Sequence, residues 1–324
     1  MTDLPTYADV VAAAERIRPY VHRPPVFTSR TLDAMTGASL FLKNEALQKV
    51  GAFKARGGCN AVFALSDAEA ARGVATHSSG NHAQAIAYAA GLRGIPATIV
   101  MPEDAPAVKV AAVEGYGARV VWAGNHPLDR ERTLERVLEQ TGAIFVHPSN
   151  DPRVIAGQGT AALELLEEVP DLEIVMVPVG GGGLLSGTAL AVAGRGRART
   201  VGAEPEKVDD AYRSLRDGVI HPPTNAETIA DGLRTFLGDI TFPIIREHVS
   251  EIVTVSEAAI IAAMRLVWER MKLIIEPSAA VPVAALFEHP EIFRGQRIGI
   301  ILSGGNADLL HLPWQADTDE DPPF

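Results

Sequence analysis

The sequence predicts an α/β protein built from open, mostly parallel β-sheets with helices on both faces. Short apolar runs alternate with amphipathic segments along almost all of the 324 residues, and no internal repeat or heptad run interrupts them. A chain of this length can form two domains or one large one. Strands that alternate with helices of this size form βα units, whose strands pair in parallel.

The apolar runs predict strands, and the amphipathic segments between them predict helices. The strand predictions are residues 40–42, 73–77, 97–101, 119–122, 174–178, 200–203, 252–255 and 297–302. The helix predictions include residues 82–92, 107–116, 128–140, 158–168, 256–271 and 278–287. Residues 73–148 form a compact stretch of alternating predicted strands and helices, which indicates a small, mobile domain. Residues 1–72 and 149–324 would form the larger domain. Residues 315–324, with four acids and two prolines, predict a disordered tail.

Composition excludes several classes of function. The formal net charge is −11 and the isoelectric point is about 5.3, so the surface should repel nucleic acid and anionic lipid. A single cysteine, Cys59, excludes a disulfide framework and a multi-cysteine metal cluster. The first residues show no basic segment followed by an apolar one, so we expect no signal peptide and a cytoplasmic protein.

One uncharged stretch, residues 174–194, is long enough to cross a bilayer. However, Pro178 and the consecutive residues Gly180, Gly181, Gly182 and Gly183 lie in its middle. They would badly weaken a continuous lipid-exposed helix. A strand, a tight turn and a helix beginning near Leu184 is therefore the better prediction, and we expect no membrane association.

Three polar or glycine-rich turns follow predicted strands, which is where open parallel sheets bind ligands. The four glycines before the helix offer backbone N–H groups and a helix N-terminus, which suit a phosphate. They match neither the Walker loop nor the dinucleotide-binding turn. A purely structural tight turn is the alternative.

The second turn is formed by Ser78, Ser79, Gly80, Asn81 and His82. Its hydroxyls, amide and backbone donors suit a carboxylate or the polar edge of a ring. Capping of the following helix by Ser79 or Asn81 is an equally good interpretation. The residue types favour a packing role for His82 over a catalytic acid.

The third turn, residues 303–306, begins with Ser303 after a predicted strand. Lys54 stands apart from the three turns, between Phe53 and small residues at the start of a helix. An isolated lysine is usually a surface charge, so spacing alone does not identify Lys54 as reactive.

Together, however, the motifs resemble a known family. Gly-Ala-Phe-Lys-Ala-Arg-Gly, Ser-Ser-Gly-Asn-His-Ala-Gln-Ala, Gly-Gly-Gly-Gly-Leu and Ser-Gly-Gly-Asn occur in the order and spacing of the serine/threonine dehydratase and serine racemase family. These are fold-type II pyridoxal-phosphate enzymes, similar to the tryptophan synthase β-subunit. The segments 147–160 and 276–279 resemble the family too. The resemblance spans roughly residues 5–310 and implies this fold, with the cofactor held by the larger domain.

The resemblance implies a role for each matching residue. Lys54 matches the lysine that bonds to pyridoxal 5'-phosphate, and Phe53 matches the residue beside the ring. Asn81 matches the side chain that contacts the ring hydroxyl, and Ser303 the hydroxyl that faces the ring nitrogen. The phosphate-binding loop matches Gly180, Gly181, Gly182, Gly183 and Leu184. Ser79 matches the family's second-face catalytic serine, and the turn Ser78, Ser79, Gly80, Asn81 and His82 would bind substrate.

Two further sites follow from the resemblance. Glu204, Asp210 and the carbonyl of Val208 resemble a divalent-cation loop that would offer hard oxygen ligands to Mg²⁺ or Ca²⁺. The alternative is a solvated acidic helix start. Arg136 aligns with a substrate-side arginine that could bind a second carboxylate, although a solvated helix arginine is the somewhat better interpretation.

The implied activity is β-elimination from serine, threonine or 3-hydroxyaspartate to a 2-oxo acid and ammonia. Ala52 and Gly58 replace the family's usual serine and alanine, and Gly-Ala-Phe-Lys is closer to the 3-hydroxyaspartate dehydratase branch. An amino acid racemase is the nearest alternative, and a non-catalytic cofactor-binding protein is another, because fold alone does not fix activity. The expected partners are a small amino acid and a second copy in a homodimer.

Overall fold

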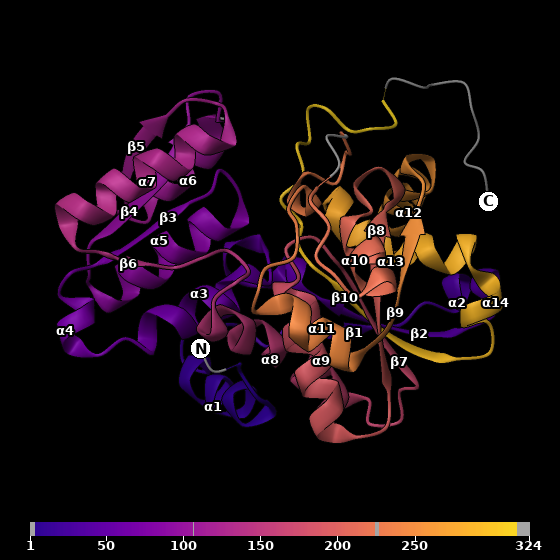
Figure 1. The fold of residues 1–324 in the computed structure, drawn as a ribbon. Coiled ribbons are helices and arrows are strands. Elements are labelled where there is room, and N and C mark those ends of the chain that lie inside the picture. The colour runs from indigo at the N-terminus through magenta and orange to yellow at the C-terminus, as the bar shows by residue number, and fades with distance from the viewer. Residues whose placement is uncertain (1–3, 106, 224–226, 316–324) are drawn as a thin grey trace.

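The computed structural model describes residues 4–105, 107–223 and 227–315. Its strands form two sheets, and Figure 1 shows them side by side, each with its own helices. The six-stranded sheet has the order β1-β2-β10-β7-β8-β9, and the four-stranded sheet has the order β5-β4-β3-β6. β1 is antiparallel to β2, and the other pairs are parallel.

The strands are β1 (Val26–Phe27), β2 (Ser39–Asn44), β3 (Val74–His77), β4 (Ala97–Pro102), β5 (Arg119–Ala123), β6 (Ile144–Phe145), β7 (Ile174–Pro178), β8 (Arg199–Pro205), β9 (Val249–Val255) and β10 (Arg297–Leu302). The helices are α1 (Tyr7–Ile17), α2 (Arg30–Thr36), α3 (Lys54–Phe63), α4 (Asp67–Ala70), α5 (Asn81–Arg93), α6 (Ala107–Gly115), α7 (Pro127–Thr141), α8 (Pro152–Glu168), α9 (Gly183–Arg195), α10 (Asp210–Asp217), α11 (Thr241–His248), α12 (Glu257–Met271), α13 (Pro277–Glu288) and α14 (Pro290–Phe293). Short 3₁₀ helices are η1 (Glu45–Leu47), η2 (Lys49–Gly51), η3 (Glu206–Val208) and η4 (Asp231–Leu233).

The six-stranded sheet is buried on both faces, which explains the continuous apolar run of its strand β7. Along β7, Ile174 and Met176 pack into one apolar cluster with residues of α2, α12, α13 and α14. Val175 and Val177 point to the opposite face, where residues of α1, α8, α9, α10 and α11 pack. The stretch 174–194 is therefore a strand, a turn and a helix, as predicted. No helix in the described part of the chain is long and apolar enough to cross a membrane.

The four-stranded sheet has a core of its own. Residues of α3, α5 and α6 pack on one face, and residues of α7 pack on the other. Cys59 lies in the first of these clusters, where burial raises the pKa of its thiol to about 12. A thiol held in its neutral form is a poor nucleophile, so Cys59 packs as a small apolar residue.

All eight strand predictions and all six helix predictions correspond to observed elements. The largest difference is at α8, which begins at Pro152 rather than at residue 158 and is capped by the Asp151 side chain. β1 and β6, of two residues each, were not predicted. The small sheet lies within residues 73–148, but the mobility of that unit stays a prediction. The proposed tail lies outside the described residues except for residue 315.

Candidate active site

Lys54 is held where the chain segment before α3 pairs with the turn after β10. Ala52 forms an antiparallel bridge with Gly304, and the Phe53 N–H donates to the Ser303 carbonyl at 2.9 Å. Gly51 adopts the left-handed conformation with φ +68°, which permits the turn. Two motifs about 250 residues apart in sequence are thus joined by backbone hydrogen bonds.

The Lys54 side chain is half-buried beside the Phe53 ring. Its Nζ donates to the Pro148 carbonyl at 2.7 Å and lies 5.1 Å from the centre of the Phe53 ring. Burial lowers the pKa of the amine to about 8, and the carboxylate of Glu276 opposes that shift. A lysine with a lowered pKa is an effective nucleophile and base near neutral pH.

A buried ion network anchors the helix that carries Lys54. Arg56 is fully buried and donates to two carboxylates. Its Nε and Nη2 donate to Glu45 at 2.7 and 2.9 Å, and its Nη1 and Nη2 each donate to Glu164 at 2.8 Å. Lys43 of β2 adds a 2.7 Å contact to Glu164. The two cations balance the two anions, and the contacts join α3 to β2, η1 and α8. The first turn of α3 is therefore rigidly placed.

The four-glycine turn links β7 to the N-terminus of α9. Gly182 has φ +80°, and no side chain caps the helix. A Cβ atom at Gly181 would lie 2.3 Å from the Ser149 Oγ, so the close approach of these segments requires glycine. Leu184 is buried below the turn. The uncapped backbone N–H groups and the helix dipole are available to an anion.

The turn before α5 forms the opposite side of the site. α5 begins at Asn81 with Gly80 as its N-cap, and no side chain caps it. The capping interpretation is therefore wrong, and the helix N-terminus stays available to a carboxylate. Ser78 and Ser79 are half-buried, and Ser78 Oγ accepts from Gly80 N at 3.2 Å.

His82, the last residue of this turn, packs against the chain that follows β6. It is buried, and its Nε2 hydrogen-bonds to the Val146 carbonyl at 3.1 Å. Burial and the nearby Lys54 hold the pKa of the imidazole well below its usual value. His82 therefore stays neutral and ties α5 to the end of β6, which agrees with the packing role favoured by the sequence.

Ser303 supplies a test of whether the site fits pyridoxal phosphate. Its hydroxyl is buried, and no hydrogen-bond partner for it exists among the described residues. A buried hydroxyl without a partner is costly. A ring nitrogen could provide the missing hydrogen bond, the glycine turn could hold a phosphate, and Lys54 could bond to an aldehyde. The residues present fit the cofactor.

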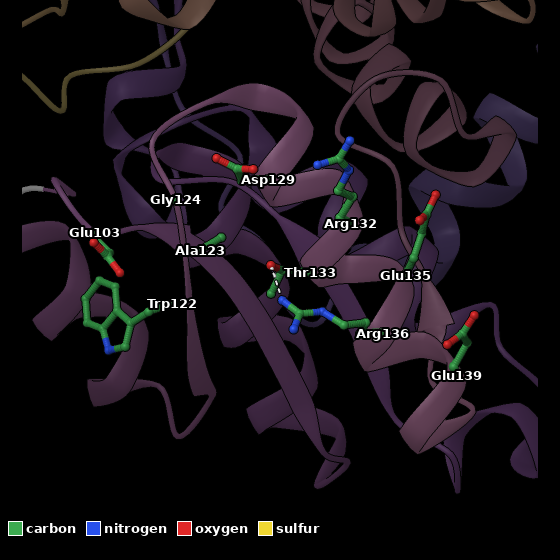
Figure 2. A pocket seen from close by; sticks show the side chains of 10 residues that line it. All are labelled: Glu103, Trp122, Ala123, Gly124, Asp129, Arg132, Thr133, Glu135, Arg136 and Glu139. Atoms are coloured by element: carbon green, nitrogen blue, oxygen red, sulfur yellow. Dashed lines mark hydrogen bonds between the residues drawn. The ribbon is translucent and has the colours of Figure 1, made fainter.

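The structure does not bring Arg136 together with these residues. Figure 2 shows it on α7, beside a cavity of about 520 Å³ that also contacts Trp122 and Ala123 at the end of β5. Its guanidinium donates to the Thr133 Oγ1 at 2.9 Å. None of the site residues described above lines this cavity.

A different arginine of α7, Arg130, has the properties of a ligand-binding residue. Its Nε is buried without a hydrogen-bond partner in the described residues. Its charge helps to lower the pKa of His77, after burial, which is the largest cause. His77 ends β3 immediately before Ser78, and its ring contacts that of His147 at 6.4 Å between centres. No local signal separates Arg130 from the other arginines of α7 in the sequence.

Glu204 and Asp210 are buried rather than solvated. Glu204 accepts backbone hydrogen bonds from Ala211 and Tyr212, whereas Asp210 Oδ2 lacks a partner among the described residues. Burial raises the pKa of Asp210 to about 7 and that of Glu204 well above its usual value. The solvated-helix interpretation therefore fails. The described residues contain no group of three or more His, Cys, Asp or Glu side chains suited to a metal.

The chain is similar to several known proteins. The family model described as pyridoxal-phosphate dependent enzyme matches residues 17–304. The chain is 51% identical over 312 residues to a beta-hydroxyaspartate dehydratase of Paracoccus denitrificans, covering 96% of this chain and 99% of the relative. It is 50% identical to a serine racemase of Oryza sativa, covering 92% and 89%. The solved structure of maize serine racemase superimposes with a TM-score of 0.93 at 47% identity, covering 97% of each chain.

Proposed function

The chain belongs to the family of pyridoxal-phosphate dependent enzymes, and on that basis we propose that it eliminates water from a small β-hydroxy amino acid. The enamine that results tautomerises to an imine, and hydrolysis of the imine takes up water again to give a 2-oxo acid and ammonia. The observation that carries the proposal is the buried Lys54 amine beside Phe53 and the paired Ser303 turn. Its relatives are ammonia-lyases and racemases, so the protein is an enzyme, and the alternative of a non-catalytic carrier is excluded.

When bound, the cofactor supplies a conjugated ring that accepts electron density from the substrate Cα. The protein's own residues do the rest. Lys54 Nζ, with its pKa lowered to about 8, takes the Cα proton as general base. The neutral Ser303 hydroxyl would leave the ring nitrogen largely unprotonated, which would favour prompt loss of a β-leaving group. The glycine turn would hold the phosphate, and Phe53 would lie beside the ring.

Two features select the substrate. The uncapped N-terminus of α5, with Ser78 and Ser79, is suited to the α-carboxylate shared by all amino acids. Arg130, with its buried and unpartnered Nε, is suited to a second carboxylate. We therefore favour 3-hydroxyaspartate over serine and threonine, in agreement with the relative from Paracoccus denitrificans, a beta-hydroxyaspartate dehydratase.

A racemase is the second candidate, and the similarity to serine racemases supports it. Racemisation requires proton delivery on both faces of the substrate, which Lys54 and Ser79 would provide. The two activities are separated by incubating the purified protein with each 3-hydroxyaspartate isomer and with L-serine. The proposal predicts 2-oxo acid and ammonia in equal amounts, exceeding the product of inversion at Cα, which is D-serine from L-serine and the diastereomer from each 3-hydroxyaspartate isomer. A predominance of the Cα-inverted amino acid would establish the racemase instead.

We also propose a Mg²⁺ or Ca²⁺ ion at Glu204, Asp210 and the Val208 carbonyl. Two buried carboxylates, one with an oxygen that lacks a partner in the described chain, are stabilised by a hard cation and water ligands. The ion would tie the end of β8 to the start of α10. The homodimer and the cytoplasmic location stay predictions from the resemblance and the composition.

A further inference from the structure

Glu276 is a buried carboxylate whose role the sequence motifs do not explain. It is 6% exposed and immediately precedes α13. Its backbone N–H donates to the Gly304 carbonyl at 3.0 Å, which places it against the Ser303 turn. A Cβ atom at Gly304 would lie only 2.8 Å from Glu276 Oε1. The carboxylate is therefore packed tightly against the turn that pairs with the Lys54 segment.

The carboxylate binds the amide of Asn81 across the gap between the two sheets. Asn81 Nδ2 lies 3.0 Å from Glu276 Oε1 and 3.2 Å from Oε2. On its other side, Asn81 Oδ1 accepts from Asn306 Nδ2 at 2.8 Å. Asn306 Nδ2 also donates to the Val50 carbonyl at 2.8 Å. An ionised carboxylate only accepts hydrogen bonds, so these contacts allow the Asn81 amide one orientation.

Placing a carboxylate here is energetically unfavourable. The pKa of Glu276 is raised to about 7, mainly by burial, and the nearby Asp231 acts in the same direction. The hydrogen bond from Asn81 and the charge of Lys109 act in the opposite direction, and Lys54 is the other cation that faces the carboxylate. A neutral side chain would avoid this desolvation cost, so the carboxylate needs a reason beyond stability.

We propose that Glu276 is a positioning residue that fixes the Asn81 amide so that its second N–H stays directed at the cofactor. The Nδ2 atom carries two hydrogens, of which Glu276 accepts one. The other is then available to the ring oxygen that Asn81 contacts by resemblance. Glutamine in place of Glu276 offers one carbonyl oxygen and one NH₂ group, so it can pair with either orientation of the Asn81 amide and no longer fixes one of them. This inference rests on the proposed function, since it requires that the site hold pyridoxal phosphate.

A double-mutant cycle tests the proposal. Glu276→Gln, Asn81→Ala and the double variant are compared by their cofactor dissociation constants and by the visible absorption band of the lysine-bound cofactor. We expect Glu276→Gln to weaken cofactor binding on the order of tenfold, the size of a lost hydrogen bond to a charged group, and to shift the band. In the Asn81→Ala background the same change should have almost no effect. Glu257→Gln, at a half-buried glutamate bonded to the Ile229 N–H, should leave both readouts unchanged.

Equal losses from Glu276→Gln in the wild-type and Asn81→Ala backgrounds would overturn the proposal. Thermal melting of the cofactor-free variants shows whether they fold. If Glu276→Gln does not fold, Asn306→Ala replaces it in the cycle, because it removes the hydrogen bond to Asn81 Oδ1. Asn306→Ala must then weaken cofactor binding in the wild-type background and have almost no effect in the Asn81→Ala background. Failure of the proposed function looks different, since the wild-type protein itself would then bind no cofactor.

Discussion

The Lys54 Nζ donates a 2.7 Å hydrogen bond to the carbonyl of Pro148, 94 residues along the chain. Pro148 lies between β6 of the four-stranded sheet and α8, which covers the six-stranded one. Its neighbour Ser149 packs against Gly181. The Lys54 amine is therefore held by the same segment that joins the two sheets and packs against the four-glycine turn.

The lowered pKa of Lys54 predicts how cofactor capture depends on pH. Only the neutral amine attacks an aldehyde, and burial brings the pKa of this amine to about 8. The rate at which cofactor-free protein takes up pyridoxal phosphate should rise with pH and level off above about 8. Stopped-flow absorbance measures this rate. A rate that keeps climbing toward the ordinary lysine value of 10.5 would show that the amine is not desolvated.

Arg130 and Arg136 provide a matched pair on α7. Arg130→Ala should raise KM for 3-hydroxyaspartate at least about tenfold and have a smaller effect with serine, because only the former carries a second carboxylate. Arg136→Ala, which changes the cavity of Figure 2, should leave both values near those of the wild type. Steady-state kinetics of 2-oxo acid release provide the measurement. A larger rise in KM for 3-hydroxyaspartate in Arg136→Ala than in Arg130→Ala would instead identify Arg136 as the residue that binds the second carboxylate.

Removal of divalent cations should destabilise the protein. A chelator leaves Glu204 and Asp210 as uncompensated buried carboxylates, so the melting temperature and the activity should both fall, and Mg²⁺ or Ca²⁺ should restore them. Asp210→Asn should abolish the response to chelator. The neighbouring Asp209→Asn should keep it, because Asp209 is already paired with Arg213 at 2.8 Å. If the chelator leaves the melting temperature of the wild-type protein unchanged, Glu204 and Asp210 do not bind a cation.

The buried network around Arg56 should dominate the stability of the Lys54 helix. Arg56→Met leaves Glu45 and Glu164 without their main partner, which should lower the free energy of unfolding by about 3–5 kcal/mol. Arg18→Met, at an exposed ion pair with Glu15, should have almost no effect. Urea unfolding of the two variants compares them directly. Equal losses of unfolding free energy in the two variants would mean that the buried network contributes no more to stability than an exposed ion pair does.

The strands were predictable because burial on both faces leaves an apolar run such as β7. The start of α8 was not, since the sequence predicts this helix only from residue 158, in a region where Gly157 and Gly159 have a low intrinsic helix propensity. In the structure they are contact points, since a Cβ at Gly157 would lie 2.7 Å from the Arg56 carbonyl and one at Gly159 2.5 Å from the Gly187 carbonyl. Close helix packing therefore overrides the local preference.

The same distinction applies to the site. Motif order and spacing identify Lys54 as a candidate because the family resemblance spans roughly residues 5–310. Arg130 and Glu276 become candidates only through the fold, which brings the charge of Arg130 near His77 and hydrogen-bonds Glu276 to Asn81. No local sequence pattern distinguishes Arg130 from the other arginines of α7, and the family-like segment 276–279 does not by itself give Glu276 a role. Residues that act through a distant neighbour need the fold before they can be recognised.

The central claim is that Lys54 carries the cofactor, and covalent trapping tests it most directly. Cofactor-saturated protein is reduced with borohydride, digested and mapped by mass spectrometry. The account predicts a single pyridoxyl-phosphate adduct on Lys54, which the Lys54→Ala variant lacks. An adduct on another lysine, or none in saturated protein, would contradict it.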